Sequence, residues 1–443
     1  MPEAEYTFPK GFLWGTATSA YQVEGNSKNH QWHLWEQEPG RIAEGQVNGL
    51  ACDWWGGRWR EDFDRAKEGH HNAIRISVEW SRIQPERDRW DEDALDHYIE
   101  MLRGLNDRSI FPMVNFHHFT DPLWLVEMGG WEHEETPALF AEYVEKVTEA
   151  LKSYVTTWLT SNEPNVPAIL GYLTGEFPPG VQDLNRSINV MTNFARGHVL
   201  AYQKIKTLQP EARVGYAHAY RGFTPKNRRN PLHKWSTMLH HQMMNEFFPS
   251  MFTHGKARIG TQTIEIPEAK GTQDFFGLNY YTSDEVAFKL SAGPKNFFSE
   301  TRFPEDAPLS PNGMIASTPH DFYDAIEWSL KWGVPIIITE NGTEDAEDSF
   351  RREYLAAHIH QLWRAVNFNY PIKGYFVWTL VDNFEWNHGW TRRFGLWELD
   401  TETQLRKKRP SADFYAEIVE KNALTSKMVR EYAPGVFEDL FPE

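Results

Sequence analysis

Two glutamates that each follow or precede an asparagine are the residues of this chain best suited to paired acid–base chemistry. Glu163 lies in the sequence SNEP at residues 161–164, and Glu340 lies in TENG at residues 339–342. Two facing carboxyl groups can cleave an acetal, because the protonated one gives its proton to the leaving oxygen while the ionised one attacks the anomeric carbon or activates water. Without further context, each would be a surface or salt-bridged residue, since the chain holds 62 acidic residues.

These glutamates can act together only if the fold brings two distant segments to one place. Short apolar or β-branched runs recur along the chain, and polar loops and amphipathic helical stretches separate them. The spacing of Leu95, Ile99, Leu102 and Leu105 is that of one buried helical face. The expected strands are 12–17, 73–78, 111–116, 155–160, 213–218, 275–280, 335–339 and 375–380. The expected helices include 92–106, 136–152, 186–208, 322–331 and 349–367.

Strands that alternate with helices pair in parallel through right-handed crossovers. Eight such units predict an α/β fold, a single (β/α)8 TIM barrel with long loops around the mouth, and we assign residues 1–443 to one catalytic domain. An open doubly wound sheet is less favoured, because no strand is followed by a GxGxxG turn. In a barrel the chemistry lies at the C-terminal strand ends, where both glutamates fall. Residues 284–318 are rich in Pro, Ser and Gly and predict an irregular rim loop.

Composition excludes several classes of protein. The 45 Lys and Arg residues against 62 Asp and Glu residues give a net charge of −17, which would repel nucleic acid. No stretch approaches the roughly 18 apolar residues of a membrane span, and the first residues do not have the pattern of a signal peptide. The lone Cys52 allows neither an internal disulfide nor a cysteine-rich metal site. We expect a cytoplasmic protein with no nucleic-acid or membrane partner. Most of the 19 tryptophans should lie in the core, although indole rings also suit the flat faces of sugars.

A series of longer motifs gives the chain a family resemblance. In order along the chain, the motifs are FPKGFLWGTATSAYQVEG, EWSRIQP, HHFTDPLW, TSNEP, GYLTGEFPPG, GLNYYT, ITENG and VWTLVDNFEWNHGW. On these motifs the chain resembles the retaining β-glycosidases of glycoside hydrolase family 1 over nearly its whole length. The resemblance implies that Glu163 is the general acid/base and Glu340 the nucleophile, with their carboxyl groups about 5–5.5 Å apart. It also implies that Arg75 and Tyr281 hydrogen-bond the nucleophile.

The same resemblance implies a sugar pocket. Its members would be Gln22, His118, Asn162, Asn279, Trp378, Glu385 and Trp386. Asn162 would hold the 2-hydroxyl, whose hydrogen bond strengthens in the transition state. Gln22 and Glu385 would bind hydroxyls around positions 4 and 6, His118 would lie near position 3, and Trp378 would form the stacking floor. Structural roles stay open for Gln22, Asn162, Tyr281 and His118, and Arg75 could be a barrel-interior ion pair.

The implied substrate is a small β-glycoside or oligosaccharide with a terminal β-D-glucosyl residue, and β-D-galactosyl and β-D-fucosyl are further candidates. Family members that act on 6-phosphorylated sugars carry a Ser and a Lys where this chain has Glu385 and Trp386, and a carboxylate would repel a phosphate. The alternatives are a 6-phospho-β-glycosidase, a β-mannosidase, a sugar-binding barrel without catalysis and a metal-dependent barrel. The last is disfavoured because the His pairs at 70–71, 117–118 and 240–241 lack a ligand spacing such as HExxH. We therefore expect no metal and no cofactor.

The chain also departs from the family pattern. Phe119 stands where a Trp is usual, and Ile315 stands four residues before Pro319, where many members have the Trp that supports the leaving group. The preference for a leaving group is therefore open. Trp80, Trp328 and Trp332 are expected to be packing residues. The basic run 406–409 is expected on a solvated loop before the last helix.

Overall fold

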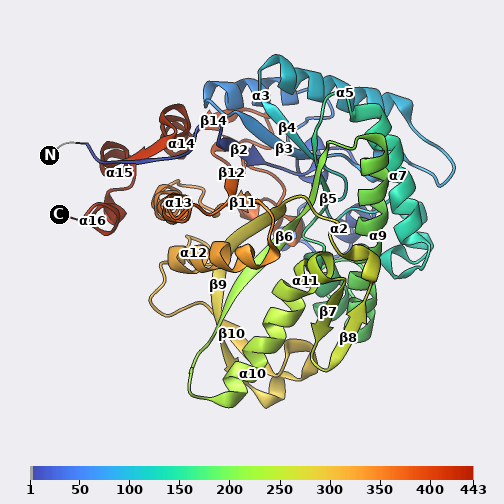
Figure 1. Cartoon of the computed structure of the whole chain (residues 1–443). Coiled ribbons are helices and arrows are strands. Elements are labelled where there is room, and N and C mark those ends of the chain that lie inside the picture. Colours follow the sequence, from blue (N-terminus) through green and yellow to red (C-terminus); the bar gives the residue numbers. More distant parts are fainter. Residues whose placement is uncertain (1–2, 443) are drawn as a thin grey trace.

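Eight parallel strands form a closed barrel in the computed structural model, which describes residues 3–442 (Figure 1). Along the barrel the order is β9, β11, β12, β2, β3, β4, β5 and β6, and pairing of β6 with β9 closes the ring. The predicted TIM barrel is therefore confirmed, and the open-sheet alternative is wrong. The strands are β2 (Leu13–Ala17), β3 (Ala73–Ser77), β4 (Phe111–Asn115), β5 (Thr157–Asn162), β6 (Arg213–Pro225), β9 (Phe276–Phe288), β11 (Ile336–Asn341) and β12 (Ile372–Trp378).

Helices surround the barrel, and the five that the sequence predicts are present with ends shifted by a few residues. The longer helices are α3 (Trp59–Glu68), α5 (Glu92–Asp107), α7 (Thr136–Leu151), α9 (Leu184–Leu208), α10 (Pro231–His240), α11 (Phe247–His254), α12 (Pro319–Ser329), α13 (Arg351–Asn367) and α14 (Pro410–Lys421). Helix α5 begins where the Asp91 carboxylate accepts a hydrogen bond from the Ala94 N–H at 2.9 Å. Shorter helices are α1 (Ala20–Glu24), α2 (Gln31–Glu36), α4 (Trp80–Ile83), α6 (Leu123–Glu127), α8 (Asn165–Ile169), α15 (Ser426–Tyr432) and α16 (Phe437–Leu440).

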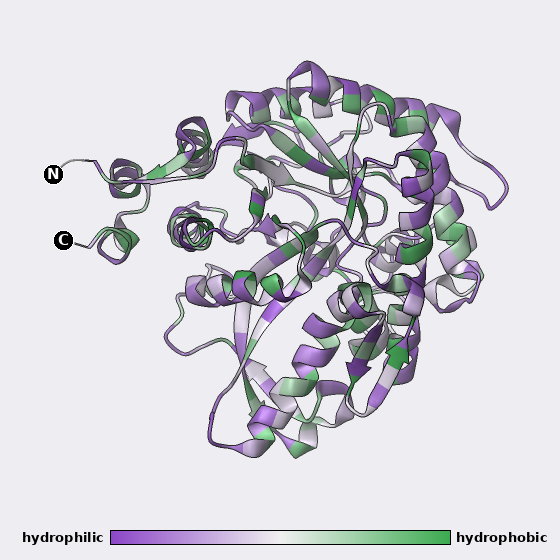
Figure 2. Ribbon diagram, in the orientation of Figure 1, coloured by the Kyte–Doolittle hydropathy of each residue, from purple (hydrophilic) through white to green (hydrophobic). Residues whose placement is uncertain are grey.

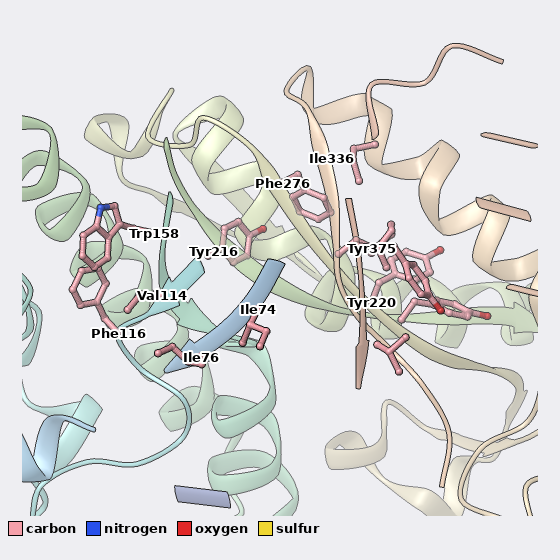
Figure 3. Close-up of a cluster of buried hydrophobic side chains, with 14 of the residues drawn as sticks. Ile74, Ile76, Val114, Phe116, Trp158, Tyr216, Tyr220, Phe276, Ile336 and Tyr375 are labelled. Carbon is pink, nitrogen blue, oxygen red and sulfur yellow. The ribbon is translucent and has the colours of Figure 1, made fainter. Parts of the chain in front are cut away.

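Side chains alternate between the two faces of each barrel strand, and this alternation separates the core from the site. Ile74 and Ile76 on β3 belong to the large cluster that packs between the barrel and its helices (Figure 3). Arg75 lies between them and faces the barrel interior, where its guanidinium reaches side chains on β5 and β11. Small and apolar residues such as Ala73 and Met113 fill the interior layer below it.

Two strands are much longer than the sequence predicts. Strands β6 and β9 continue beyond residues 218 and 280 and stay paired in parallel as far as Pro225 and Val286. A further strand, β10 (Ser299–Arg302), then pairs antiparallel with the end of β9. The expectation that residues 284–318 form a wholly irregular rim loop is therefore wrong in part, because about the first half of this segment, up to Arg302, belongs to a β-hairpin.

The basic run at 406–409 is not a solvated loop. Residues 406–408 form strand β14 (Arg406–Lys408), which pairs with β13 (Trp397–Leu399). The side chains of Arg406 and Arg409 are buried against the carboxylates of Asp62 and Asp382, at 3.1 and 2.8 Å, while those of Lys407 and Lys408 stay exposed. The prediction failed because a buried carboxylate requires a cation, and sequence alone did not reveal these two distant partners.

Three two-stranded sheets lie outside the barrel, and one of them joins the ends of the chain. Strand β1 (Glu5–Thr7) pairs with β15 (Ala423–Thr425), and β7 (Lys256–Ile259) pairs with β8 (Gln262–Glu265). The surrounding helices carry both hydrophilic and hydrophobic residues along their length, as expected for one solvent face and one buried face (Figure 2). Trp80, Trp328 and Trp332 pack within the large core cluster, as expected. No helix within residues 3–442 is long and apolar enough to cross a membrane.

Candidate active site

A cavity of about 360 Å³ opens at the C-terminal ends of the barrel strands and receives both candidate carboxyl groups. Glu163 directly follows β5, and Glu340 is the penultimate residue of β11. The structure also places His118, Asn162, Asn279, Tyr281, Trp378, Glu385 and Trp386 in the cavity wall. The two glutamates therefore share one cavity although they lie far apart in the sequence.

Glu340 receives hydrogen bonds from a cation and from a phenol. Arg75 Nη1 lies 2.5 Å from Glu340 Oε1, and Tyr281 Oη donates to Glu340 Oε2 at 2.6 Å. Arg75 is fully buried and Glu340 is 3% exposed, so water screens this ion pair weakly. Both donors stabilise the ionised carboxylate, because each directs positive charge at one of its oxygens.

Asn162 connects this ion pair to His118 in the cavity wall. Its Oδ1 accepts hydrogen bonds from Arg75 Nη2 at 2.5 Å and from Asn279 Nδ2 at 3.1 Å. Its Nδ2 lies 2.9 Å from Nε2 of His118. Burial and the nearby Arg75 charge lower the pKa of His118 well below its usual value, so the imidazole is neutral. Nε2 then accepts from Asn162, and the proton lies on Nδ1, which has no partner among residues 3–442.

Glu163 has a different environment. Its Oε1 accepts one hydrogen bond, from the neutral Asn279 amide at 2.9 Å. Burial raises the pKa of Glu163, and the negative charge of Glu340 raises it further. The backbone of Glu163 has a left-handed φ of 44°, which is rare for a residue with a side chain, and its N–H donates to the Ala217 carbonyl at 2.7 Å. A carboxyl group that stays protonated at neutral pH can donate a proton.

A third carboxyl group lies at the other end of the cavity. Burial, followed by the charge of Glu340, raises the pKa of Glu385 to about 8. Gln22 Nε2 lies 3.4 Å from Glu385 Oε2 and donates to the Phe384 carbonyl at 2.8 Å. Gln22 is fully buried, and it lies beside Glu385 without belonging to the cavity wall. The rings of His118 and Trp386 stack with their centroids 5.8 Å apart, so the aromatic side of the pocket is packed before any ligand enters.

Part of the cavity wall was largely missed by sequence reasoning. Val166, Phe177, Met244 and Met314 line it beside Ile315, the residue found where a Trp is usual. Glu344 holds Met314 in place, because its Oε1 accepts hydrogen bonds from the Met314 N–H at 3.2 Å and from the hydroxyl of Ser310. Ile315 and Phe177, which lies in the motif GYLTGEFPPG, were the signals in the sequence, since Met244 and Met314 lie in segments without a recognisable motif.

Comparison with known proteins adds independent evidence. The model of the family described as glycosyl hydrolase family 1 matches residues 4–424. Beta-glucosidase A of Thermotoga maritima is 32% identical over 448 residues, which cover 94% of this chain and 98% of the relative. A beta-galactosidase of Pyrococcus woesei is 30% identical over 511 residues, covering 97% of this chain and all of the relative. The structure of beta-glucosidase from Thermotoga maritima in complex with glucoimidazole superposes with a TM-score of 0.87 at 31% identity, covering 95% of this chain and 100% of that one.

Proposed function

The chain belongs to glycosyl hydrolase family 1, and we propose that it removes terminal, non-reducing β-D-glucosyl residues from oligosaccharides or from aryl and alkyl glycosides, with retention of configuration. The observation that carries this proposal is the contrast between two buried carboxyl groups in one cavity. Glu340 is paired with a guanidinium and a phenol, whereas Glu163 meets only a neutral amide and keeps a raised pKa. One group suits a nucleophile and the other suits a proton donor.

In the first step, Glu340 attacks the anomeric carbon. The bond from that carbon to the leaving oxygen breaks, and Glu163 gives its proton to this oxygen, so that the leaving group departs as a neutral alcohol or phenol. Arg75 and Tyr281 keep Glu340 ionised and direct its oxygens. The product of this step is a glycosyl ester on Glu340 and an ionised Glu163.

In the second step, water cleaves that ester. The negative charge of Glu340 is one reason for the raised pKa of Glu163, and the ester carries no such charge. The pKa of Glu163 therefore falls when the intermediate forms, and the group that was an acid can act as a base. Glu163 takes a proton from water, the water oxygen bonds to the anomeric carbon, and Glu340 leaves as a carboxylate.

The remaining polar side chains suit the hydroxyls of a single sugar ring. We assign Asn162 to the 2-hydroxyl, because it lies between Arg75 and His118. His118 is assigned to the neighbouring 3-hydroxyl, because it lines the cavity beside Asn162. Gln22 and Glu385 are assigned to hydroxyls at positions 4 and 6, and Trp378 to the face of the ring.

The choice of sugar follows from the end of the pocket that holds Glu385. A phosphate at position 6 would require cations, whereas Trp378, Trp386 and the neutral His118 provide none. A neutral Glu385 can both donate and accept hydrogen bonds, which suits hydroxyls of either orientation at position 4. Because one relative is named a beta-glucosidase and another a beta-galactosidase, β-D-galactosyl and β-D-fucosyl groups are the second candidates.

A panel of p-nitrophenyl glycosides tests the proposal. The β-glucoside should have the highest kcat/KM, followed by the β-galactoside and β-fucoside, while the β-mannoside and the 6-phospho-β-glucoside should be poor substrates. Proton NMR of the first product should show the β-anomer before mutarotation. Release of the α-anomer, or the highest kcat/KM on the phosphorylated sugar, would contradict the proposal.

A further inference from the structure

A second cavity of about 580 Å³ lies next to the catalytic cavity. Helix α8 and the π-helical turn Leu170–Thr174, both after the Glu163 loop, form one wall. The π-helical turn His241–Glu246 after α10 forms another wall, and the β9–β10 hairpin closes the outer side. Met244 is the one residue that lines both cavities.

The two cavities adjoin at Met244, and some of the same elements line both of them. On α8, Val166 lines the catalytic cavity and Ile169, three residues later on the same helical face, lines the second one. On β6, Arg221 lines the first cavity and Phe223, which points to the same face of the strand, lines the second. A leaving group that extends from the catalytic cavity past Met244 is therefore directed toward the second cavity.

Apolar side chains form one part of the lining of the second cavity, and polar ones such as Thr174, Lys295 and Asn296 form another part. Ile169, Leu173, Phe223, Met243, Met244 and Phe297 contribute side chains that are largely buried. Several of its polar groups already have partners. Nε2 of His240 lies 2.7 Å from Ser299 Oγ, and burial lowers the pKa of this imidazole to about 4. Lys289 and Glu300 form an ion pair with each other at 2.8 Å.

Met244, which lines both cavities, is held through its backbone carbonyl and its sulfur. Asn165, two residues after Glu163, donates from Nδ2 to the Met244 carbonyl at 2.9 Å, and the same amide lies 3.4 Å from the sulfur. Methionine is unbranched and adapts to apolar ligands of different shape. Met314 faces the same side of the catalytic cavity, so flexible apolar side chains border the path out of it.

From this arrangement we infer that the second cavity binds the distal part of an extended apolar leaving group, such as a long alkyl chain, and not further sugar units. The inference rests on the proposed function and names its class of substrate. A sugar unit would need hydrogen-bonding partners for its hydroxyls, and the lining next to Met244 offers hydrocarbon and sulfur. Burial of each CH2 group there favours the longer substrate.

A series of alkyl β-D-glucosides, from methyl to decyl and below their micelle concentrations, tests this inference. Burial of a CH2 group is worth up to about 0.8 kcal/mol, so kcat/KM should rise by about 2- to 4-fold per CH2 group once the chain passes Met244. Cellobiose, cellotriose and cellotetraose should show no comparable rise. The blocking variant is Ala292→Trp, because Ala292 lines the second cavity from a half-buried surface turn away from the catalytic groups.

Ala292→Trp should abolish the chain-length effect and leave kcat/KM for methyl and phenyl β-glucoside unchanged. Ala138→Trp is the matched control, since it adds the same side chain at an exposed position on α7 that lines neither cavity. A flat chain-length series, a series that Ala292→Trp does not alter, or a rise with cello-oligosaccharide length would overturn the inference. If phenyl β-glucoside is not hydrolysed at all, the proposed function fails instead, so the two failures are distinguishable.

Discussion

Removal of the amide that contacts Glu163 is a direct test of this residue as the proton donor. Asn279 Nδ2 donates to Glu163 Oε1 at 2.9 Å, and this hydrogen bond lowers the pKa of Glu163 because it favours the ionised form. The variant Asn279→Leu keeps a similar shape and has no donor. We expect the pKa of Glu163 to rise further, so the decline of kcat/KM at high pH should begin at a higher pH.

The size of this pKa shift follows from the strength of the Asn279–Glu163 hydrogen bond when Glu163 is ionised and when it is protonated. A hydrogen bond to a charged group contributes about 1.5–3 kcal/mol, and one to a neutral group about 0.5–1.5 kcal/mol. The difference is about 1–1.5 kcal/mol, which corresponds to roughly one pH unit, since one unit of pKa is about 1.36 kcal/mol. Glu163 is only 9% exposed, so screening by water should reduce this value little.

The assay is the pH profile of kcat/KM for methyl or phenyl β-glucoside, whose poor leaving groups need the proton. Thr339→Val is the matched control, because the Thr339 hydroxyl donates to Asn279 Oδ1 at 2.6 Å without touching Glu163. The control should move the high-pH limb by less than about 0.3 units, well below the unit expected for loss of a direct hydrogen bond. If Asn279→Leu is folded, with an unchanged near-UV spectrum, and its high-pH limb does not move upward, Glu163 is not the group that titrates there.

Three further substitutions address the other roles. Glu340→Gln should have no measurable turnover on any β-glucoside. A 2-deoxy-2-fluoro-β-glucoside should label the parent protein at Glu340, as seen by peptide mass spectrometry, and should not label the variant. Labelling at another residue would exclude Glu340 as the nucleophile. Glu163→Ala should lower kcat/KM for phenyl β-glucoside by about 10²–10⁴-fold and spare 2,4-dinitrophenyl β-glucoside, whose leaving group needs no proton; an equal loss on both would argue against an acid role. Glu385→Gln should stabilise the protein more at pH 8 than at pH 5. The pKa of Glu385 is about 8 in the folded state and about 4.5 in the unfolded chain, so between these pH values the folded state binds more protons and its stability falls as pH rises. Glutamine does not titrate, so the variant lacks this loss of stability. Thermal unfolding at the two pH values measures this, and equal changes in Tm would contradict it.

The sequence predicts the barrel because its signals are local and repeated. Each strand is a short apolar run, and helices such as α5 show their buried face through the spacing of leucines. Strand ends were less predictable. β5 and β11 extend two residues beyond the apolar runs, to Asn162 and Asn341, because barrel neighbours supply backbone hydrogen bonds to polar residues there. The extra length of β6 and β9 also depends on tertiary structure, because the extended part of each strand forms only by pairing with the other.

The candidate site was predictable as a list of residues, while its arrangement was not. Motifs name Glu163, Glu340 and their neighbours, but they do not reveal that Asn279 donates to Glu163 or that Arg75 reaches Asn162. Met244 and Met314 lie in the cavity wall without belonging to a motif, because such apolar residues resemble core residues until the fold leaves one side of them open. The buried Arg406 and Arg409 show the converse, since a run of charge resembles a surface until distant carboxylates are found.

The position of Arg75 connects Glu340 to the residues around Glu163. Because Ile74 and Ile76 face the helices, alternation along β3 directs Arg75 into the barrel, and its planar guanidinium offers one nitrogen to Glu340 and another to Asn162. Asn162 accepts from Arg75 and Asn279 through the same oxygen, and Asn279 in turn contacts Glu163. Glu340, Asn162 and Glu163, the proposed nucleophile, sugar-binding amide and proton donor, thus belong to one hydrogen-bond network. We therefore expect that a sugar hydroxyl bound to Asn162 affects the hydrogen bonds of Arg75 and Asn279, which contact Glu340 and Glu163. Correct placement of the substrate would in this way be linked to the chemistry at its anomeric carbon.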